Sequence, residues 1–190
     1  MISYSEKINY DNDFTFKDLQ KQCSLIKLLQ KQQTQLSNHL EKLLYHSHPS
    51  LIQYCKKGIP TWLLEILTHY PTAKKLSRAR VDKVSKISHV TIEKAEKLIE
   101  GAGKSVASYT SETDAMMIRH LVFQIQNIDI LIGENKDNLV KTCNLPEVKL
   151  LCTFKGISEY SAIVLLVNIV TIARFSSVKK LASYFGLHPV

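Results

Sequence analysis

The sequence predicts an all-α protein with two long coiled-coil-type helices that flank a small helical insert. A helix-hairpin-helix-like domain follows at the C-terminus. Two apolar stripes repeat at spacings of three and four residues, and no segment shows the alternation typical of a strand. Pro and Gly residues separate the helical segments. The predicted divisions are an irregular leader at 1–14, a coiled-coil region at 15–146 with a basic insert at 71–110, and a C-terminal domain at 147–190.

The first long helix is predicted from Thr15 to His48, a span without Gly or Pro. Thr15 is its expected N-cap, with Asp18 three residues later, close to a capping box. Gln33 lies in the middle of the apolar stripe as a polar break. A helix of about seven turns needs a partner helix to cover such a stripe. The stripe consists of Leu19, Cys23, Ile26, Leu29, Leu36, Leu40 and Leu43.

Pro49 ends this helix and opens a connector at 49–60. A short helix is predicted over Thr61–Tyr70, where Trp62 stands beside four aliphatic residues. A Trp can stack on a base, but in such company it is more typical of a core. Further short helices are expected at 73–77, 81–87 and 91–100, the last stopped by the glycines at 101 and 103.

Positive charge is concentrated in the insert. The chain has a formal net charge of +8, which favours an anionic partner. Two alternatives stay open: a DNA-contacting surface, or a helical cap whose lysines keep it soluble. The nine basic residues at 71–110, against four acids, are Lys74, Lys75, Arg78, Arg80, Lys83, Lys86, Lys94, Lys97 and Lys104. The first five of these are the candidate nucleic-acid-binding residues of the insert.

The second long helix is predicted to begin at Ser111, again with an acid, Asp114, three residues later. Gln124 interrupts its apolar stripe. The two striped helices suggest an antiparallel coiled-coil hairpin, although either stripe could equally pair with a second copy of the chain. The second stripe consists of Met117, Leu121, Ile128 and Leu131, and continues weakly to Leu139.

The C-terminal domain is predicted to contain helices at 148–153, 159–173 and 178–184, with Gly186 just past the last one. Lys155, Gly156, Ile157 and Ser158 form the turn between the first two helices. Such a turn can hold a phosphate, because the N-terminus of the following helix carries free N–H groups and partial positive charge. A simple αα-corner is the alternative reading.

No catalytic or metal-binding set is predicted. The acids are dispersed, and Asp11 and Asp13, which are close in sequence, lie in the leader. The four cysteines are scattered, so we expect reduced thiols in a cytoplasmic protein. His46 and His48 lack partners at zinc spacing and are expected to be solvated. No apolar run is long enough to span a membrane.

The terminal stretch resembles the C-terminal transposase domain of one insertion-sequence family, known as one-ten/one-sixteen. Its members are DEDD transposases, now known as bridge-RNA-guided recombinases. The order of the shared motifs carries the resemblance: Leu151-x-x-Phe154-Lys155-Gly156-Ile157, Ser161-Ala162, Leu165-Leu166, Arg174-Phe175, Lys180-Leu181-Ala182 and Tyr184-Phe185-Gly186-Leu187-x-Pro189. Asn38-His39-Leu40, Tyr70-Pro71-Thr72 and Glu93-Lys94-Ala95 extend it upstream.

The resemblance implies that the catalytic groups lie outside this sequence. In the family, an N-terminal RNase H-like domain supplies four acids that bind Mg²⁺, and a serine nucleophile follows the terminal Gly-Leu-x-Pro motif. We therefore expect a transposase fragment truncated at both ends, which retains DNA-binding and assembly parts but not strand exchange, and which binds no cofactor itself. The expected partners are DNA, structured RNA as a further candidate, and a second copy through the coiled coil. The alternative is a stand-alone helical protein that pairs with or inhibits full-length transposase.

Overall fold

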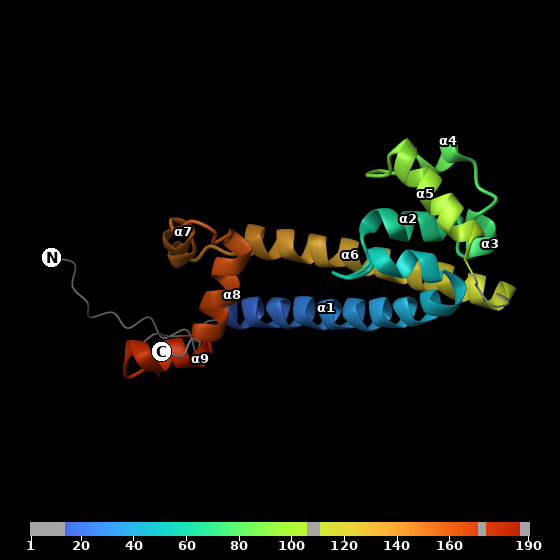
Figure 1. Cartoon of the computed structure of the whole chain (residues 1–190). Helices are drawn as coiled ribbons and strands as arrows, with labels where there is room; N and C mark the ends of the chain where they lie inside the picture. The colour runs from blue at the N-terminus through green and yellow to red at the C-terminus, as the bar shows by residue number, and fades with distance from the viewer. Residues whose placement is uncertain (1–13, 106–110, 171–173, 187–190) are drawn as a thin grey trace. The chain divides into compact units, whose positions relative to one another are not determined.

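The computed structural model describes residues 14–105, 111–170 and 174–186, and its regular elements in these ranges are all helical (Figure 1). The predicted all-α class is confirmed. The elements are α1 (Phe14–Ser47), the 3-10 helix η2 (Pro49–Tyr54), α2 (Thr61–His69), α3 (Ala73–Leu76), α4 (Val81–Val84), α5 (Ile92–Gly103), α6 (Glu112–Thr142), α7 (Pro146–Cys152), α8 (Glu159–Ile169) and α9 (Val178–Tyr184).

The chain divides into two compact units, and α1 and α6 contribute residues to both. One unit spans 29–132, and the other combines the described parts of 1–28 and 133–190. The predicted divisions at 1–14, 15–146 and 147–190 stay a prediction. The insert helices α3 and α5 pack against each other, as do α4 and α5, and α7 packs against α8.

The core of the 29–132 unit joins α1, α2, the insert helices and α6. Leu40 and Leu44 of α1 are fully buried in one cluster with Leu63 and Ile66 of α2 and Ile118 of α6. The predicted burial of the α1 stripe is confirmed at Leu19, Cys23, Ile26 and Leu40, and Leu36 and Leu43 are half-buried against the same core. Burial of this aliphatic surface is the main stabilising contribution to the unit.

The predicted stripe on α6 is wrong in register. Met117 and Leu131 are 37% and 43% exposed, and Gln124 is exposed as well. The spacing of three and four is also satisfied by a second set of positions on the same helix, and that set is the one the fold buries. The buried residues of this set are Ala115, Ile118, Val122, Ile125 and Ile132, whereas Leu139, the last residue of the predicted stripe, is fully buried as predicted.

A polar pair explains why both stripes contain a break. Gln33 of α1 donates a hydrogen bond from Nε2 to Oδ1 of Asp129 of α6, at 3.0 Å. Asp129 is itself exposed, but it continues the spacing of the buried residues Ile125 and Ile132 along α6. A polar residue in a helix seam costs stability but specifies register when its partner is opposite. The break on α6 is therefore Asp129 and not Gln124.

Helix ends follow the predicted caps at several positions. The Ser111 amide donates to Oδ2 of Asp114 at 2.9 Å, and the Asp114 amide donates to Oγ of Ser111 at 3.1 Å, so the predicted capping box is confirmed. The Ser111 amide and the Ser111 hydroxyl both donate to the Asp114 carboxylate, and these two hydrogen bonds lower its pKa. The Thr91 side chain caps α5 by accepting from the Lys94 amide. Thr15, in contrast, lies within α1 and does not cap it, because Phe14 is already helical.

Other predicted boundaries need correction. α5 continues through Gly101 and Gly103, because Ala102 is buried in the core and its burial offsets the weak helix propensity of the two glycines. α8 ends at Ile169, where Val170 takes a φ of 61°, so the helix predicted to reach 173 is shorter. The connector predicted at 49–60 contains η2. α9 and the left-handed Gly186, with a φ of 73°, agree with prediction.

Candidate nucleic-acid interface

The insert presents its cations on the loops and short helices between Thr72 and Val90. Three of the five predicted binding residues, Lys74, Arg78 and Lys83, are exposed and have no acidic partner among the described residues. The Thr72 side chain accepts from the Lys75 amide and fixes the first turn of α3, which carries Lys74. These three side chains are therefore free to contact an anion.

The other two predicted residues of the insert are already paired. Lys75 Nζ lies 3.2 Å from Oε1 of Glu112, the first residue of α6. Arg80 donates from Nε and Nη2 to the two carboxylate oxygens of Asp82, both at 3.0 Å. A guanidinium held in this bidentate geometry has fewer donors for a phosphate. The sequence did not predict the two pairs, since Glu112 lies 37 residues from Lys75 along the chain and Asp82 was counted only among the four acids of the insert.

Further lysines of the insert are neutralised along α5. Lys97 pairs with Glu93 at 2.9 Å, and Lys104 pairs with Glu100, each across one helical turn. These partners lower the pKa of both carboxyls, and Glu93 raises the pKa of Lys97. The open positive charge of the insert thus lies on its α3–α4 side and not along α5.

Trp62 is not available for base stacking. Lys94 Nζ lies 3.5 Å from the centroid of its ring, and the Tyr54 ring packs edge-on at 5.4 Å between centroids. Lys94 also donates to the His89 carbonyl oxygen at 3.1 Å. Partial burial lowers the pKa of the Lys94 ammonium. Of the two roles considered for Trp62, base stacking and packing within the protein, its surroundings favour packing.

The C-terminal turn lies in the other unit and has the local geometry of a capped helix start. Gly156 takes a φ of +96°, a conformation that favours glycine, and a Cβ there would meet nothing within 4 Å. Ser158 accepts from the Ser161 amide at 3.3 Å and is the N-cap of α8. Lys155 and Ser158 are exposed and Ile157 is half-buried. Glu159, the first residue of α8, places an exposed carboxylate beside the turn, which would compete with a phosphate.

His48 is a buried packing residue, so its predicted solvation is wrong; His46 is exposed. His48 Nε2 lies 3.1 Å from the Tyr70 carbonyl oxygen, which can only accept, so Nε2 carries the proton. Nδ1 is buried and has no hydrogen-bond partner among the residues that the structure describes. Burial lowers the pKa of His48 to about 4. The neutral ring joins the end of α1 to the segment before the insert.

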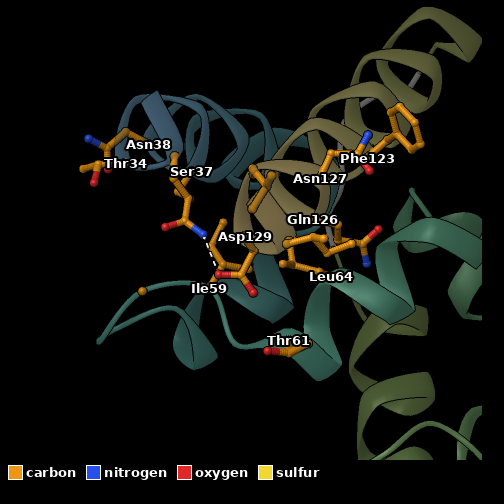
Figure 2. Close-up of a pocket in the computed structure, with 14 residues that line it drawn as sticks. Thr34, Ser37, Asn38, Ile59, Thr61, Leu64, Phe123, Gln126, Asn127 and Asp129 are labelled. Carbon is orange, nitrogen blue, oxygen red and sulfur yellow. Dashed lines mark hydrogen bonds between the residues drawn. The ribbon is translucent and has the colours of Figure 1, made fainter. Parts of the chain in front are cut away.

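A cavity of about 700 Å³ opens between α1, α6 and the loop before α2, within the 29–132 unit (Figure 2). Its polar lining is made of amides and hydroxyls together with the Asp129 carboxylate, which Gln33 holds. Phe123 and Ile130 lie in its lining and are 64% and 59% exposed. No sequence pattern predicted this cavity, since its residues come from three separate segments.

Within 14–105, 111–170 and 174–186, no three His, Cys, Asp or Glu side chains gather in a way that could hold a metal ion. Among the described helices, none combines the length and the apolar character needed to cross a bilayer.

Comparison with known proteins gives one match. A search of curated proteins and a search of solved structures each found none. The match begins within α7 and includes α8 and α9, the part of the chain in which the sequence motifs already resembled a transposase domain. Residues 148–190 match the protein-family model described as "Transposase IS116/IS110/IS902 family", and this segment is therefore transposase-related.

Proposed function

We propose that this chain acts in DNA transposition or recombination as a component that contacts nucleic acid and assembles with transposase subunits. The family match over 148–190 supports the transposase part of the proposal. The observation that carries the nucleic-acid part is a group of exposed cations, Lys74, Arg78 and Lys83, for which the described ranges of the chain contain no acidic partner. DNA is the expected partner, and structured RNA with its similar phosphate backbone is the second one to test.

Phosphate contact is the chemistry that such cations favour. Each phosphate that a Lys or Arg neutralises releases bound counterions, so the binding constant falls steeply as salt rises. The turn Lys155–Ser158 would add a backbone contact at the start of α8, with Ser158 fixing the helix end. Strand exchange is not part of this proposal, and the expectation that its catalytic groups lie outside this sequence stays a prediction.

A salt titration tests the nucleic-acid proposal. For about four phosphate contacts, affinity for duplex DNA is expected to fall about a hundredfold between 50 and 200 mM salt. Fluorescence anisotropy with a labelled duplex and with a labelled RNA hairpin would measure it. An affinity that does not change with salt concentration, or no binding to either probe, would contradict the proposal.

The assembly part rests on the α6 stripe that the fold leaves partly uncovered. Met117 is 37% exposed, and Leu121 and Ile128 are half-buried, at heptad-like spacing on one side of the helix. A shallow groove beside this stripe is lined by Ile128 and Gln124 together with Leu36 of α1. This stripe suits a helix of a second copy. It is also the observation that favours the alternative function, pairing with a full-length transposase.

Ile128→Asp is the variant that tests self-association through this stripe. Leu121 is less suitable, because it also packs against the core of the unit and its substitution would disturb folding. We expect wild-type chain to self-associate in sedimentation velocity and Ile128→Asp to sediment as a monomer. Met116→Asp, on another side of α6 and 46% exposed, is the control and should behave as wild type. Identical sedimentation of all three proteins as monomers would exclude self-association; co-purification of wild type with a full-length transposase would then favour the alternative.

A further inference from the structure

We propose that the cavity between α1, α6 and the loop before α2 is a pocket for one unpaired nucleobase. The inference rests on the proposed function and deepens it, because it assigns single-stranded nucleic acid to a site whose lining includes none of the cations of the insert. The cavity volume of about 700 Å³ is in the range of small-ligand pockets.

The lining fits a base and not a phosphate. None of its residues is a Lys or Arg, and the Asp129 carboxylate would repel an anion. Gln126 and Thr61 supply donors and acceptors, while Ile59 and the buried Leu64 supply apolar surface (Figure 2). Neutral hydrogen-bonding groups next to apolar surface are the pattern that recognises the edges and faces of bases.

Phe123 supplies the stacking surface. Its ring projects from α6 at the edge of the cavity and is 64% exposed, although an aromatic side chain gains from burial (Figure 2). A base lying on an exposed aromatic ring is the usual way in which proteins hold single-stranded nucleic acid, and each such stack contributes substantially to affinity. Ile130, one of the other lining residues and 59% exposed, extends the apolar surface.

Two lysines lie in the loop that adjoins the cavity, where they would contact the phosphates of the bound single-stranded nucleic acid. Lys56 and Lys57 immediately precede Gly58, which lines the cavity, and a backbone bridge joins Lys56 to Gly58. Both side chains are exposed and have no acidic partner in the part of the chain that the structure describes. A base in the cavity would thus have its phosphates beside two lysines.

The carboxylate also gives the pocket a chemical preference. Asp129 accepts from Gln33 through Oδ1, so its Oδ2 is the oxygen that can face a ligand. A carboxylate oxygen accepts from the exocyclic amines of adenine, cytosine or guanine, whereas thymine and uracil have none. The pocket should therefore favour amino-bearing bases over thymine and uracil.

Anisotropy with labelled single-stranded 12-mers and a labelled duplex tests the proposal. Phe123→Ala should weaken binding of a mixed adenine–cytosine strand about 5- to 100-fold and leave duplex binding unchanged. Wild type should bind that strand more tightly than an all-thymine strand. Met116→Ala, another exposed apolar residue of α6 that does not line the cavity, is the control and should have no effect. Thermal melts would verify that both variants fold, as expected for exposed positions.

The outcomes separate the two proposals. Salt-dependent duplex binding with no effect of Phe123→Ala on either strand would overturn the pocket and leave the proposed function standing. Equal losses for single strand and duplex, or equal effects of Phe123→Ala and Met116→Ala, would also overturn it. Phe123→Ala that abolished self-association without changing nucleic-acid binding would assign the surface to a protein partner. Absence of binding to every probe would contradict the proposed function itself.

Discussion

Lowering the pH from about 6.5 to 4 is expected to remove about 3 kcal/mol of stability through His48 alone. Its pKa is about 4 in the folded chain and 6.5 when unfolded, so the unfolded state binds the proton first. Above pH 6.5 the ring is neutral in both states and the protein keeps its full stability. As the pH is lowered from 6.5 towards the folded pKa of about 4, the free energy of unfolding decreases. Protonation would place a positive charge in the core, together with an Nδ1–H group that no described residue accepts from.

Urea denaturation followed by circular dichroism at several pH values would measure this loss. His46→Asn is the control, because His46 is exposed and the variant should keep the wild-type pH profile. His48→Gln can still donate to Tyr70 but does not titrate, so its profile should be flat in this window. Carboxyls with lowered pKa values, such as Asp114, lose their contributions at lower pH than His48 does. A wild-type profile that matched His48→Gln would refute the account of His48.

Ile118→Ala is expected to cost about 2–5 kcal/mol of stability, because Ile118 is fully buried and its truncation leaves a cavity. Met117→Ala, at the neighbouring position, should cost about 1 kcal/mol or less, since Met117 is 37% exposed. Urea denaturation of both variants at pH 7 would compare them. The two substitutions distinguish the two registers of α6 directly. A larger cost at Met117 than at Ile118 would support the register predicted from sequence and contradict the observed one.

For the two long helices, the sequence predicted where each helix lies along the chain better than it predicted which face is buried. Absence of Gly and Pro over α1 and the capping box of Ser111 and Asp114 are local signals, and the structure follows them. On α6, however, Met117–Leu121–Ile128–Leu131 and Ile118–Val122–Ile125–Ile132 satisfy the same spacing. Packing in the tertiary core decides between them, and Ile118, Val122 and Ile125 are the residues that enter the core shared with α1 and α2.

The candidate sites divide in the same way. Concentration of lysines in the insert could be read from the sequence, but which of them are neutralised depends on partners such as Glu112, brought to Lys75 by folding. The His48 environment depends on Tyr70, which lies 22 residues away along the chain. The cavity beside Phe123 combines three segments that carry no shared motif. Sequence motifs identified the C-terminal segment well, because its order of residues is local and is matched by the family.

The salt dependence of nucleic-acid binding by a charge variant tests the central claim most directly. Changing Lys74, Arg78 and Lys83 together to Gln should make the slope of log affinity against log salt less steep by about one for each removed cation. The matched control changes Lys97, Lys104 and Lys21 to Gln, which removes the same charge from lysines that are already paired. Its slope should stay near the wild-type value. Equal slopes for the two variants would show that net charge alone drives binding and would contradict a specific interface on the insert.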